Sequence, residues 1–487
     1  MSRGAPASHP ALVDARPEVF WLDDPARPEV LPGLVGTEEA DLVVVGGGYA
    51  GLWAALRAKE RDPARDVVLL EKGRCGDQAS GRNGGFASAS LTHGFGNGVA
   101  RWPEEMGTLD RLGADNLAAI GDAVERYGID CHWERTGELT VAGAPHEVGE
   151  LAALAASLES AGHRVELLDA AQTQARVASP TYHAGLLEPD ATAMVEPARL
   201  AWGLRAACQG LGVRVHEGTP VTAVERDGAA MRVRTPAGEV RAGRVVLATN
   251  AFPPLLRRLR LMTVPVYDYV LMTEPLSPAQ RESVGWAGRE GVGDASNMFH
   301  YYRLTRDDRN LHPTTSLAPL ATPRGPRILW GGYDAVYHYA SRIDPRLEQA
   351  GGTHALLARQ FFETFPQLEG LRFSHRWAGV IDTCTRFAAF YGTAYDGRVA
   401  YALGFTGLGV AATRFGADVV LDLLDGADTE RTRLRMVRER PLPFPPEPVR
   451  FAGVQLTRWS MGRADAHEGR PNLWLRGLDR LGLGFDS

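Results

Sequence analysis

The stretch DLVVVGGGYAGLWAALRAKERDPARDVVLLE, residues 41–71, contains the pattern that decides the fold. It opens with a short apolar run containing three valines, as a strand buried in a parallel sheet requires. Three glycines follow, and the apolar positions from Ala50 to Ala58 then recur with a helical period. A second apolar run, residues 67–70, comes after the turn-prone pair Asp62-Pro63. The stretch therefore predicts a strand, a tight turn, a helix and a second strand parallel to the first.

The glycines of the turn have the spacing GxGxxG, and each has its own physical use. The first permits a sharp turn, the second lets the backbone approach a pyrophosphate, and the third lets the helix pack closely on the strand. The helix then points its free N–H groups at the phosphates. An acidic residue after the second strand accepts hydrogen bonds from ribose hydroxyls. The motif predicts a dinucleotide site formed by Gly46, Gly48, Tyr49, Ala50, Gly51 and Glu71.

The identity of the dinucleotide depends on the residues around and after the second strand. Glu71, in place of an arginine, disfavours the 2′-phosphate of NADP, whereas FAD and NAD both fit. Residues 78–86, QASGRNGGF, resemble the ASGRNGG loop of the D-amino-acid-oxidase-like flavoprotein superfamily, particularly of its glutamylputrescine-oxidase-like branch. In that superfamily the loop passes from the pyrophosphate to the flavin ring. The resemblance implies FAD as the cofactor and adds to the site Lys72, Ser80, Gly81, Arg82, Asn83, Gly84 and Gly85.

Two later regions resemble the rest of the cofactor domain of the same superfamily. A helix expected over residues 197–209 and strands expected over 213–216, 221–226, 231–235 and 244–251 resemble its second half. Residues 377–382 and 398–410 resemble its closing segments, where a GxxGxG turn and a helix of small residues bring backbone N–H groups to the pyrimidine edge of the flavin. The cofactor residues implied are Val221, Thr249, Asn250, Gly379, Gly404, Thr406, Gly407, Leu408 and Gly409.

The region between these segments has a different pattern. Residues 264–276, 297–311 and 327–339 are rich in aromatic and β-branched side chains, which predicts an antiparallel sheet. A helix is expected over residues 348–365. In the first half, helices are expected over 109–127 and 147–161 and strands over 129–134 and 137–142.

We therefore predict an α/β fold with α+β character, in which a Rossmann-like FAD-binding domain is interleaved with an antiparallel-sheet substrate domain. The expected parts are an N-terminal extension (1–40), the FAD-binding domain with inserted helices and strands (41–262), the substrate domain (263–370), the closing part of the FAD-binding domain (371–440), and a Pro-rich linker with a C-terminal tail (441–487). The tail is amphipathic, and we expect it to dock on the body of the chain.

The composition of the 487 residues is that of an ordinary enzyme, with 44% hydrophobic residues and a net charge of −6. Acidic and basic residues are mixed along the chain. This balance disfavours nucleic acid as a partner. No apolar run approaches the roughly 20 residues that span a bilayer, and the first residues lack the apolar segment of a signal peptide, so we expect a cytoplasmic protein without membrane insertion. The four cysteines are far apart and form no CxxC, which indicates neither a metal site nor a disulfide framework.

The resemblance implies a reaction as well as a cofactor. Enzymes of this superfamily move a hydride from the carbon that bears an amine to flavin N5, and water hydrolyses the resulting imine. We therefore expect a small-molecule amine or amino acid as substrate, and oxygen or another electron acceptor. Arg303 is a candidate carboxylate clamp with Tyr302 beside it, His338 a candidate proton acceptor, and Arg386 a candidate neighbour of the flavin. Asp268 and Glu274 are candidates for recognising a cationic polyamine.

Two alternatives share the first motif. An FAD-dependent hydroxylase would use NAD(P)H and oxygen, and would carry a second cofactor strand of GD type, whereas Gly293-Asp294 lies before an aromatic strand instead. The other alternative is a flavin-binding protein without turnover.

Two details of the cofactor chemistry also follow from the resemblance. Some relatives place a lysine over the flavin to activate oxygen, but the two lysines, Lys59 and Lys72, lie in and just after the first motif. Oxygen use would then depend on another cation, or the electrons would go to another acceptor. Cys384 falls several positions beyond the cysteine that carries the flavin in some relatives, so we expect non-covalent FAD.

Overall fold

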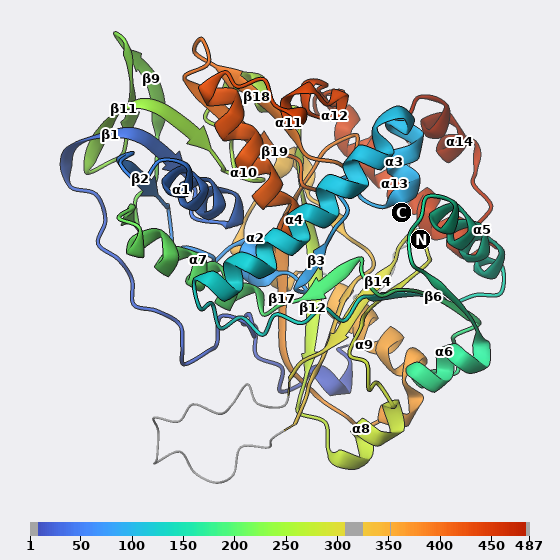
Figure 1. Ribbon diagram of the computed structural model, residues 1–487. Helices are drawn as coiled ribbons and strands as arrows, with labels where there is room; N and C mark the ends of the chain where they lie inside the picture. Colours follow the sequence, from blue (N-terminus) through green and yellow to red (C-terminus); the bar gives the residue numbers. More distant parts are fainter. Residues whose placement is uncertain (1–7, 307–324, 351, 484–487) are drawn as a thin grey trace, which may run out of the picture.

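Two β-sheets dominate the computed structural model, which describes residues 8–306, 325–350 and 352–483 (Figure 1). The order of the first sheet is β18 (Phe390–Ala394), β19 (Val399–Leu403), β11 (Gly238–Leu247), β1 (Gly36–Val45), β2 (Val67–Leu70) and β8 (Arg214–His216). Two further strands, β9 (Ala223–Asp227) and β10 (Ala230–Arg234), form a hairpin beside β11. The central strands from β19 to β8 run parallel.

The first sheet is buried on both faces, as its near-continuous apolar strands require. Leu42 and Val44 of β1 face a core that also contains side chains of four helices, whereas Val43 and Val45 face a second core under the β9–β10 hairpin. The four helices are α1 (Tyr49–Arg61), α4 (Met106–Arg126), α7 (Pro197–Gly210) and α10 (Gly409–Asp425). This half is the predicted Rossmann-like unit.

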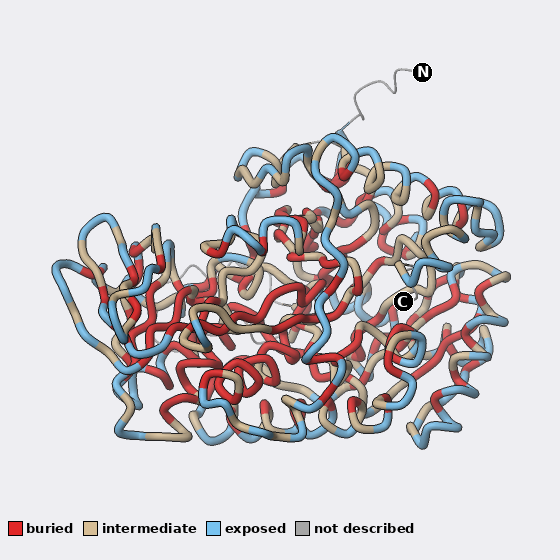
Figure 2. Tube along the Cα trace, turned by 90° about the horizontal axis from the view of Figure 1, so that it is seen from above, coloured by how far each residue is buried: buried red, intermediate tan, exposed pale blue. Residues whose placement is uncertain are grey.

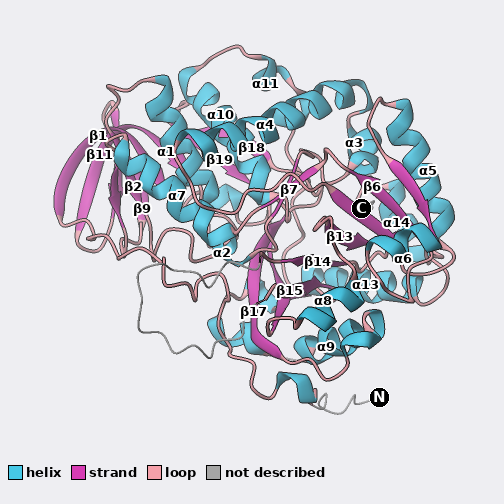
Figure 3. Cartoon of the chain, turned by 60° about the horizontal axis from the view of Figure 1, so that its bottom comes forward, coloured by secondary structure: helices cyan, strands magenta, loops and turns pink. Residues whose placement is uncertain are grey.

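The second sheet lies beside the first, and the two appear as separate groups of strands in Figure 3. Its order is β16 (Val336–Tyr337), β12 (Val264–Thr273), β15 (Ile328–Gly332), β14 (His300–Leu304), β13 (Gly291–Asp294), β4 (Glu138–Ala142), β6 (Ala184–Glu188) and β5 (Glu166–Asp169), with β17 (Phe373–Thr383) paired to β12. Trp330 packs edge-on against Phe361 of helix α9 (Thr353–Thr364), and Tyr302 packs against Phe365, which follows that helix. Figure 2 shows the buried residues of both halves in the interior.

The two halves are interleaved more deeply than the sequence indicates. Residues 138–188, assigned above to the FAD-binding domain, contribute three strands to the second sheet, because β4 pairs in parallel with β13. Strand β17, assigned to the closing part of the FAD-binding domain, pairs with β12 over its whole length. The domain boundaries therefore stay a prediction, whereas the predicted mixed α/β class with a parallel and a largely antiparallel sheet is confirmed.

The remaining elements are short strands and helices around the sheets. The strands β3 (Phe86–Ser88) and β7 (Thr192–Met194) pair with each other. The helices are α2 (Ala79–Arg82), α3 (Phe95–Arg101), α5 (Glu147–Ser160), α6 (Ala170–Arg176), α8 (Pro278–Val284), α11 (Glu430–Arg433), α12 (Arg435–Arg438), α13 (Val449–Asp465) and α14 (Leu473–Arg480). None of the described helices is both long and apolar enough to cross a membrane.

Three predicted elements differ from the structure. Residues 129–134 form no strand, because His132 has a left-handed backbone (φ 51°) that interrupts an extended run. The expected helix over 348–365 begins only at Thr353, since the glycine pair of residues 351–352 precedes it. The strand expected to continue to Ala251 ends at Leu247, before the left-handed Asn250 (φ 49°). Of the strand expected over 297–311, residues 307–311 lie outside the described residues.

Candidate functional site

A cavity of about 2000 Å³ takes its walls from both sheets. One end lies at the carboxyl ends of β1 and β2, where Val45 and Leu70 line it. The walls continue along β12 and β17 and reach α13 and α14. Because small-molecule pockets usually measure roughly 300–1,000 Å³, this cavity has room for a dinucleotide and a second molecule.

The turn after β1 depends on its glycines. Gly46 has φ 111°, and a Cβ on it would overlap the carbonyl oxygen of Ala248. A Cβ on Gly51 would overlap the carbonyl oxygen of Gly46. A Cβ on Gly48 would lie 2.9 Å from Oγ of Ser80. The turn therefore brings the N-terminus of α1 to the cavity wall with no side chain in between, which is the arrangement that binds a pyrophosphate.

Glu71 marks the end of the cavity beside β2. Its Oε2 accepts a hydrogen bond from Gly47 N at 2.6 Å and its Oε1 from Gly73 N at 2.7 Å. Burial raises the pKa of this carboxyl, while the two backbone donors act in the opposite direction. An ionised carboxylate offers about four acceptor sites, so Glu71 retains capacity for the ribose hydroxyls of an adenosine. Lys72, with its ammonium 5.9 Å from the ring centre of Phe252, lines the same end.

The glycine-rich loop after α2 is held by hydrogen bonds from both halves of the molecule. Asn83 Nδ2 donates to the carbonyl oxygens of Ala79 and Ser80, and Gly85 N donates to Asn83 Oδ1 at 2.8 Å. Two buried tryptophans fix the loop from outside: Trp21 Nε1 donates to the carbonyl of Asn83 at 2.9 Å and Trp377 Nε1 to that of Arg82 at 2.8 Å. Trp21 thus attaches the N-terminal extension to this loop.

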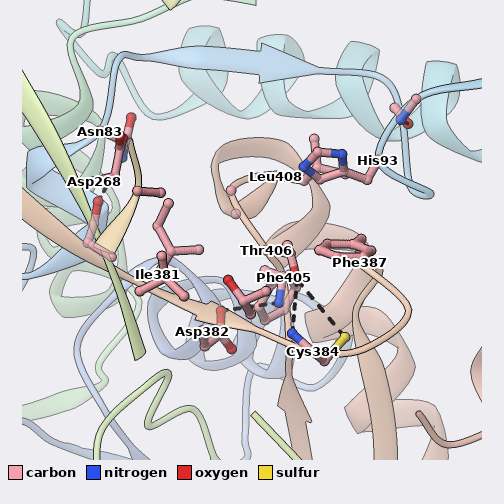
Figure 4. A pocket seen from close by; sticks show the side chains of 18 of the residues that line it. Asn83, His93, Asp268, Ile381, Asp382, Cys384, Phe387, Phe405, Thr406 and Leu408 are labelled. Carbon is pink, nitrogen blue, oxygen red and sulfur yellow. Dashed lines mark hydrogen bonds between the residues drawn. The ribbon is translucent and has the colours of Figure 1, made fainter. Parts of the chain in front are cut away.

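The segment of residues 404–408, which precedes α10, is held by a buried carboxylate. Asp382 Oδ2 accepts a hydrogen bond from Gly404 N at 2.5 Å, and Oδ1 accepts one from Phe405 N at 3.2 Å (Figure 4). Burial raises the pKa of Asp382 to about 7, although these N–H donors oppose the shift. Thr406 and Gly407 have φ 48° and 92°, so the chain turns sharply and presents the N-terminus of α10 to the cavity.

Most of the predicted cofactor residues line this one cavity. They are Gly46, Gly48, Tyr49, Ala50, Glu71, Lys72, Ser80, Arg82, Asn83, Gly84, Val221, Thr249, Asn250, Gly379, Thr406, Gly407, Leu408 and Gly409. Four others, Gly51, Gly81, Gly85 and Gly404, lie behind the wall, where an added Cβ would overlap or press on a neighbour. Those four glycines permit close packing instead of facing the cavity.

The structure places the four predicted catalytic residues away from the cavity wall. Arg303 is buried under the glycine-rich loop, where its Nη1 donates to the carbonyl of Val195 at 2.5 Å. Tyr302 Oη lies 2.7 Å from Tyr182 Oη in the core of the second sheet. Arg386 donates to the backbone carbonyls of residues 388, 389 and 439. The ring of His338 packs edge-on against Tyr267.

The cavity wall is lined by other polar and aromatic residues in place of the four predicted catalytic ones. Asp268 of β12 and Tyr301 of β14 line the cavity. In Figure 4 Asp268 lies on the side of Asn83, and His93 and Phe387 lie on the other side of the view. Burial lowers the pKa of His93. The sequence carried a signal for Asp268, as an acidic residue within an aromatic strand, and none for His93, which lies in an irregular loop.

The C-terminal tail docks over the cavity, as expected from its amphipathic pattern. Thr457 on α13 and Trp474 on α14 both line the cavity, and Trp474 Nε1 donates to Thr457 Oγ1 at 2.9 Å. Leu473 and Leu481 point away and are 81% and 69% exposed.

Residues 41–423 match the sequence model of the family described as FAD dependent oxidoreductase, abbreviated DAO. The chain belongs to this family. Gamma-glutamylputrescine oxidoreductase of Escherichia coli is 32% identical over 402 residues, which cover 80% of this chain and 84% of that protein. The probable oxidoreductase OrdL of Haemophilus influenzae is 28% identical over 425 residues, which cover 84% and 88%. Glycine oxidase from Geobacillus kaustophilus shares the fold, with a TM-score of 0.62 over 81% of this chain and 96% of that structure at 20% identity.

As a member of this family, the protein is an FAD-dependent oxidoreductase, and its cavity fits the cofactor. The glycine turn, where a Cβ would fill the space beside α1, suits a pyrophosphate, and Glu71 retains acceptor sites for a ribose. The tail helices α13 and α14 lie beyond the residues that match the family. They line the cavity from outside the matched segment.

Proposed function

We propose that this FAD-dependent oxidoreductase oxidises an amine or amino acid by hydride transfer from the amine-bearing carbon to flavin N5, giving an imine that water hydrolyses. The observation that carries the proposal is a single cavity that joins the dinucleotide end at Glu71 to a wall bearing Asp268 and Tyr301. The likeness to a relative named gamma-glutamylputrescine oxidoreductase supports an amine as substrate.

The proposed roles of the cofactor residues follow the cavity from end to end. Glu71 binds the ribose, Val221 and Lys72 border the adenine, and the N-terminus of α1 with Ser80 holds the pyrophosphate. Residues 406–409, at the N-terminus of α10, would hold the pyrimidine edge of the flavin. Bound FAD supplies a two-electron acceptor at N5.

The chain's own groups prepare this acceptor and shield it. The N-terminus of α10 stabilises negative charge beside it through backbone N–H groups, and Asp382 holds the turn that aims them. Phe387 and Phe405 form apolar wall at the same place and exclude water. We assign Arg303 a positioning role, because it holds the carbonyl oxygens of Gly84 and Val195 under the glycine-rich loop of residues 78–86, here called the flavin loop.

We also propose that FAD is held without a covalent bond. Cys384 lines the cavity, but its Sγ donates to the carbonyl of Ala388 at 3.2 Å. Burial raises the pKa of this thiol, so the thiolate that attachment needs is disfavoured.

The electron acceptor is proposed to be oxygen or another oxidant reached without a lysine over the flavin. Lys59 Nζ donates to the carbonyls of Pro63 and Arg65 at the far end of α1, and Lys72 lies at the adenine end.

Anaerobic mixing of the FAD-loaded protein with a panel of amines, N-methyl amino acids and amino acids tests the proposal. We expect one amine class to bleach the visible absorption of oxidised flavin, and the colour to return on admission of an electron acceptor, rapidly in air if the enzyme is an oxidase. Bleaching by NAD(P)H and by no amine would overturn the proposal in favour of a hydroxylase.

A further inference from the structure

Asp268 and Tyr301 form a hydrogen-bonded pair on the cavity wall. Tyr301 Oη donates to Asp268 Oδ2 at 2.5 Å, and both residues line the cavity. In the strand register Asp268 lies opposite Gly379, one of the predicted flavin neighbours. Figure 4 shows Asp268 on the same side of the cavity as Asn83 of the flavin loop. The pair is therefore placed beside the region proposed for the flavin ring.

The ring of Tyr301 occupies a slot that glycines keep open. A Cβ added to Gly84 or to Gly331 would lie 2.7 Å from the ring, and one added to Gly332 would lie 3.3 Å from it. Phe86 packs edge-on against the same ring, with the ring centres 5.8 Å apart. Because glycines of two separate segments make this room, the phenol has one position, and that position puts its hydroxyl on Asp268.

The phenol of Tyr301 acts only as a donor in this pair. Burial raises its pKa well above the usual value, and the neighbouring carboxylate of Asp268 acts in the same direction. The other groups that face Asp268 are also neutral donors, the backbone N–H groups of Gly332 and Tyr269. Gly379, across from it on β17, carries no side chain. Asp268 is thus a carboxylate held by neutral donors and open to a cation from the cavity.

The arginines of the cavity wall, within the described residues, each face a carboxylate. Arg82 Nη1 lies 2.7 Å from Glu348 and Arg450 Nε lies 3.1 Å from Glu447. Arg164 and Arg458 pair with Asp190 and Asp334. The wall therefore offers a substrate a carboxylate without a cationic partner, and each of its arginines is already paired.

We propose that Asp268, positioned by Tyr301, binds the ammonium group of the substrate and accepts its proton, so that the enzyme prefers amines lacking an α-carboxylate to α-amino acids. This inference rests on the proposed function and names the substrate class of the same site. Asp268 is a catalytic residue in this scheme and Tyr301 a positioning residue.

The proton passes directly from the substrate ammonium to the carboxylate of Asp268. An N–H bond of the ammonium breaks and an O–H bond forms on Asp268, which converts the substrate into a neutral amine. The lone pair released on nitrogen then forms the C=N bond as the C–H bond breaks, and the hydride, with both electrons, goes to bound FAD. The amine is oxidised to an iminium ion, which water hydrolyses.

The test uses a cation that binds but has no hydrogen on its amine-bearing carbon, tert-butylammonium. Its binding to the FAD-loaded protein is followed by calorimetry and by the flavin spectrum, with pivalate as an anion of the same shape. We expect the wild-type protein to bind tert-butylammonium and not pivalate, and Asp268→Asn to weaken that binding by at least about tenfold, as loss of a charged hydrogen bond predicts.

Glu274→Gln is the matched control, because Glu274 is a carboxylate that follows the same strand and does not line the cavity. It is expected to bind tert-butylammonium like the wild type. The FAD content and thermal unfolding of Asp268→Asn, compared with those of the wild type, check that any loss of binding is not a folding defect. Equal affinity of Asp268→Asn and wild type, or binding of pivalate by the wild type, would overturn the inference. Because no oxidation occurs, these results are distinct from a failure of the proposed function, which would show as no bleaching by any amine.

Discussion

The two ends of the cavity are built in opposite ways. The dinucleotide end comes from one continuous stretch, residues 41–71, and presents backbone N–H groups and a single carboxylate. The proposed substrate end is assembled from the flavin loop, β12, β14 and β15, which are far apart in sequence, and presents side chains. Backbone binding requires residues without side chains at fixed spacing, whereas side-chain binding requires only that distant strands meet.

The same contrast appears in the glycines. At the dinucleotide end they let a helix and two strands approach, and at the substrate end they make room for one aromatic ring. Substitutions at the first end should therefore affect cofactor and stability together, and those at the second should affect the reaction alone.

The largest effect is expected for Gly51→Ala. Its Cβ would overlap the carbonyl oxygen of Gly46, so the helix must move off the strand, and overpacking of this kind costs up to about 3 kcal/mol. We expect loss of bound FAD and a matching drop in the free energy of unfolding, measured by flavin content and urea denaturation. Gly149→Ala on α5, where a Cβ meets nothing within 4 Å, is the control and is expected to be neutral or stabilising. A Gly51→Ala protein with full FAD would contradict the role of the close approach.

A pH dependence sharpens the contrast at the substrate end. Burial raises the pKa of Asp268 to about 6, and the Tyr301 hydroxyl partly opposes this shift. Only the ionised carboxylate accepts a proton, so kcat/KM for an amine should fall as pH drops below about 6.

Tyr301→Phe removes the donor that favours the charged form of Asp268, so the pKa of Asp268 should rise. The fall in kcat/KM should then begin at a higher pH than in the wild type. The rate of anaerobic flavin reduction, measured against pH in the wild type and in Tyr301→Phe, gives the pH of this fall in each protein. The same value in both proteins would show that Asp268 is not the group that titrates.

Gly331→Ala should produce a smaller effect confined to the reaction. Its Cβ would lie 2.7 Å from the Tyr301 ring and displace the phenol from Asp268. We expect amine reduction to slow by about tenfold, the value of one hydrogen bond to a charged group, with FAD content unchanged. Gly107→Ala, where a Cβ has open space, serves as the control. A loss of FAD from Gly331→Ala as large as that from Gly51→Ala would mean that cofactor binding and the reaction do not depend on different ends of the cavity.

Asp382 holds the turn before α10, and its titration should appear in the stability of the FAD-free protein. Its folded pKa of about 7 lies above the ordinary value of 3.8, so between these values the folded state binds more protons than the unfolded state. Stability should therefore fall by about 2 kcal/mol between pH 5 and 7 from this group alone. Asp382→Asn should show a correspondingly flatter pH dependence in urea denaturation, and an identical slope would contradict the assignment.

The smallest effect is expected for Cys384→Ser. If FAD is held without a covalent bond, acid precipitation should release it from both the wild type and the variant. Flavin that stays with the precipitated wild-type protein and not with the variant would show attachment at Cys384.

The sequence predicted the strand, glycine turn, helix and second strand of residues 41–71 because these elements are contiguous there. At the substrate end it predicted the strands but not the face that each side chain occupies. Successive strand residues point to opposite sides, so Tyr301 faces the cavity while Tyr302 packs toward α9. Arg303 shares the face of Tyr301 but lies under the flavin loop, a long-range contact with no local signal.

The most direct measurement is the anaerobic rate of flavin reduction by n-butylamine and by norvaline, its α-carboxylate counterpart, in wild type and Asp268→Asn. The account predicts faster reduction of the wild type by n-butylamine than by norvaline, and a loss of at least about tenfold in Asp268→Asn with FAD fully bound. Faster reduction by norvaline, or equal rates in the two proteins, would contradict it.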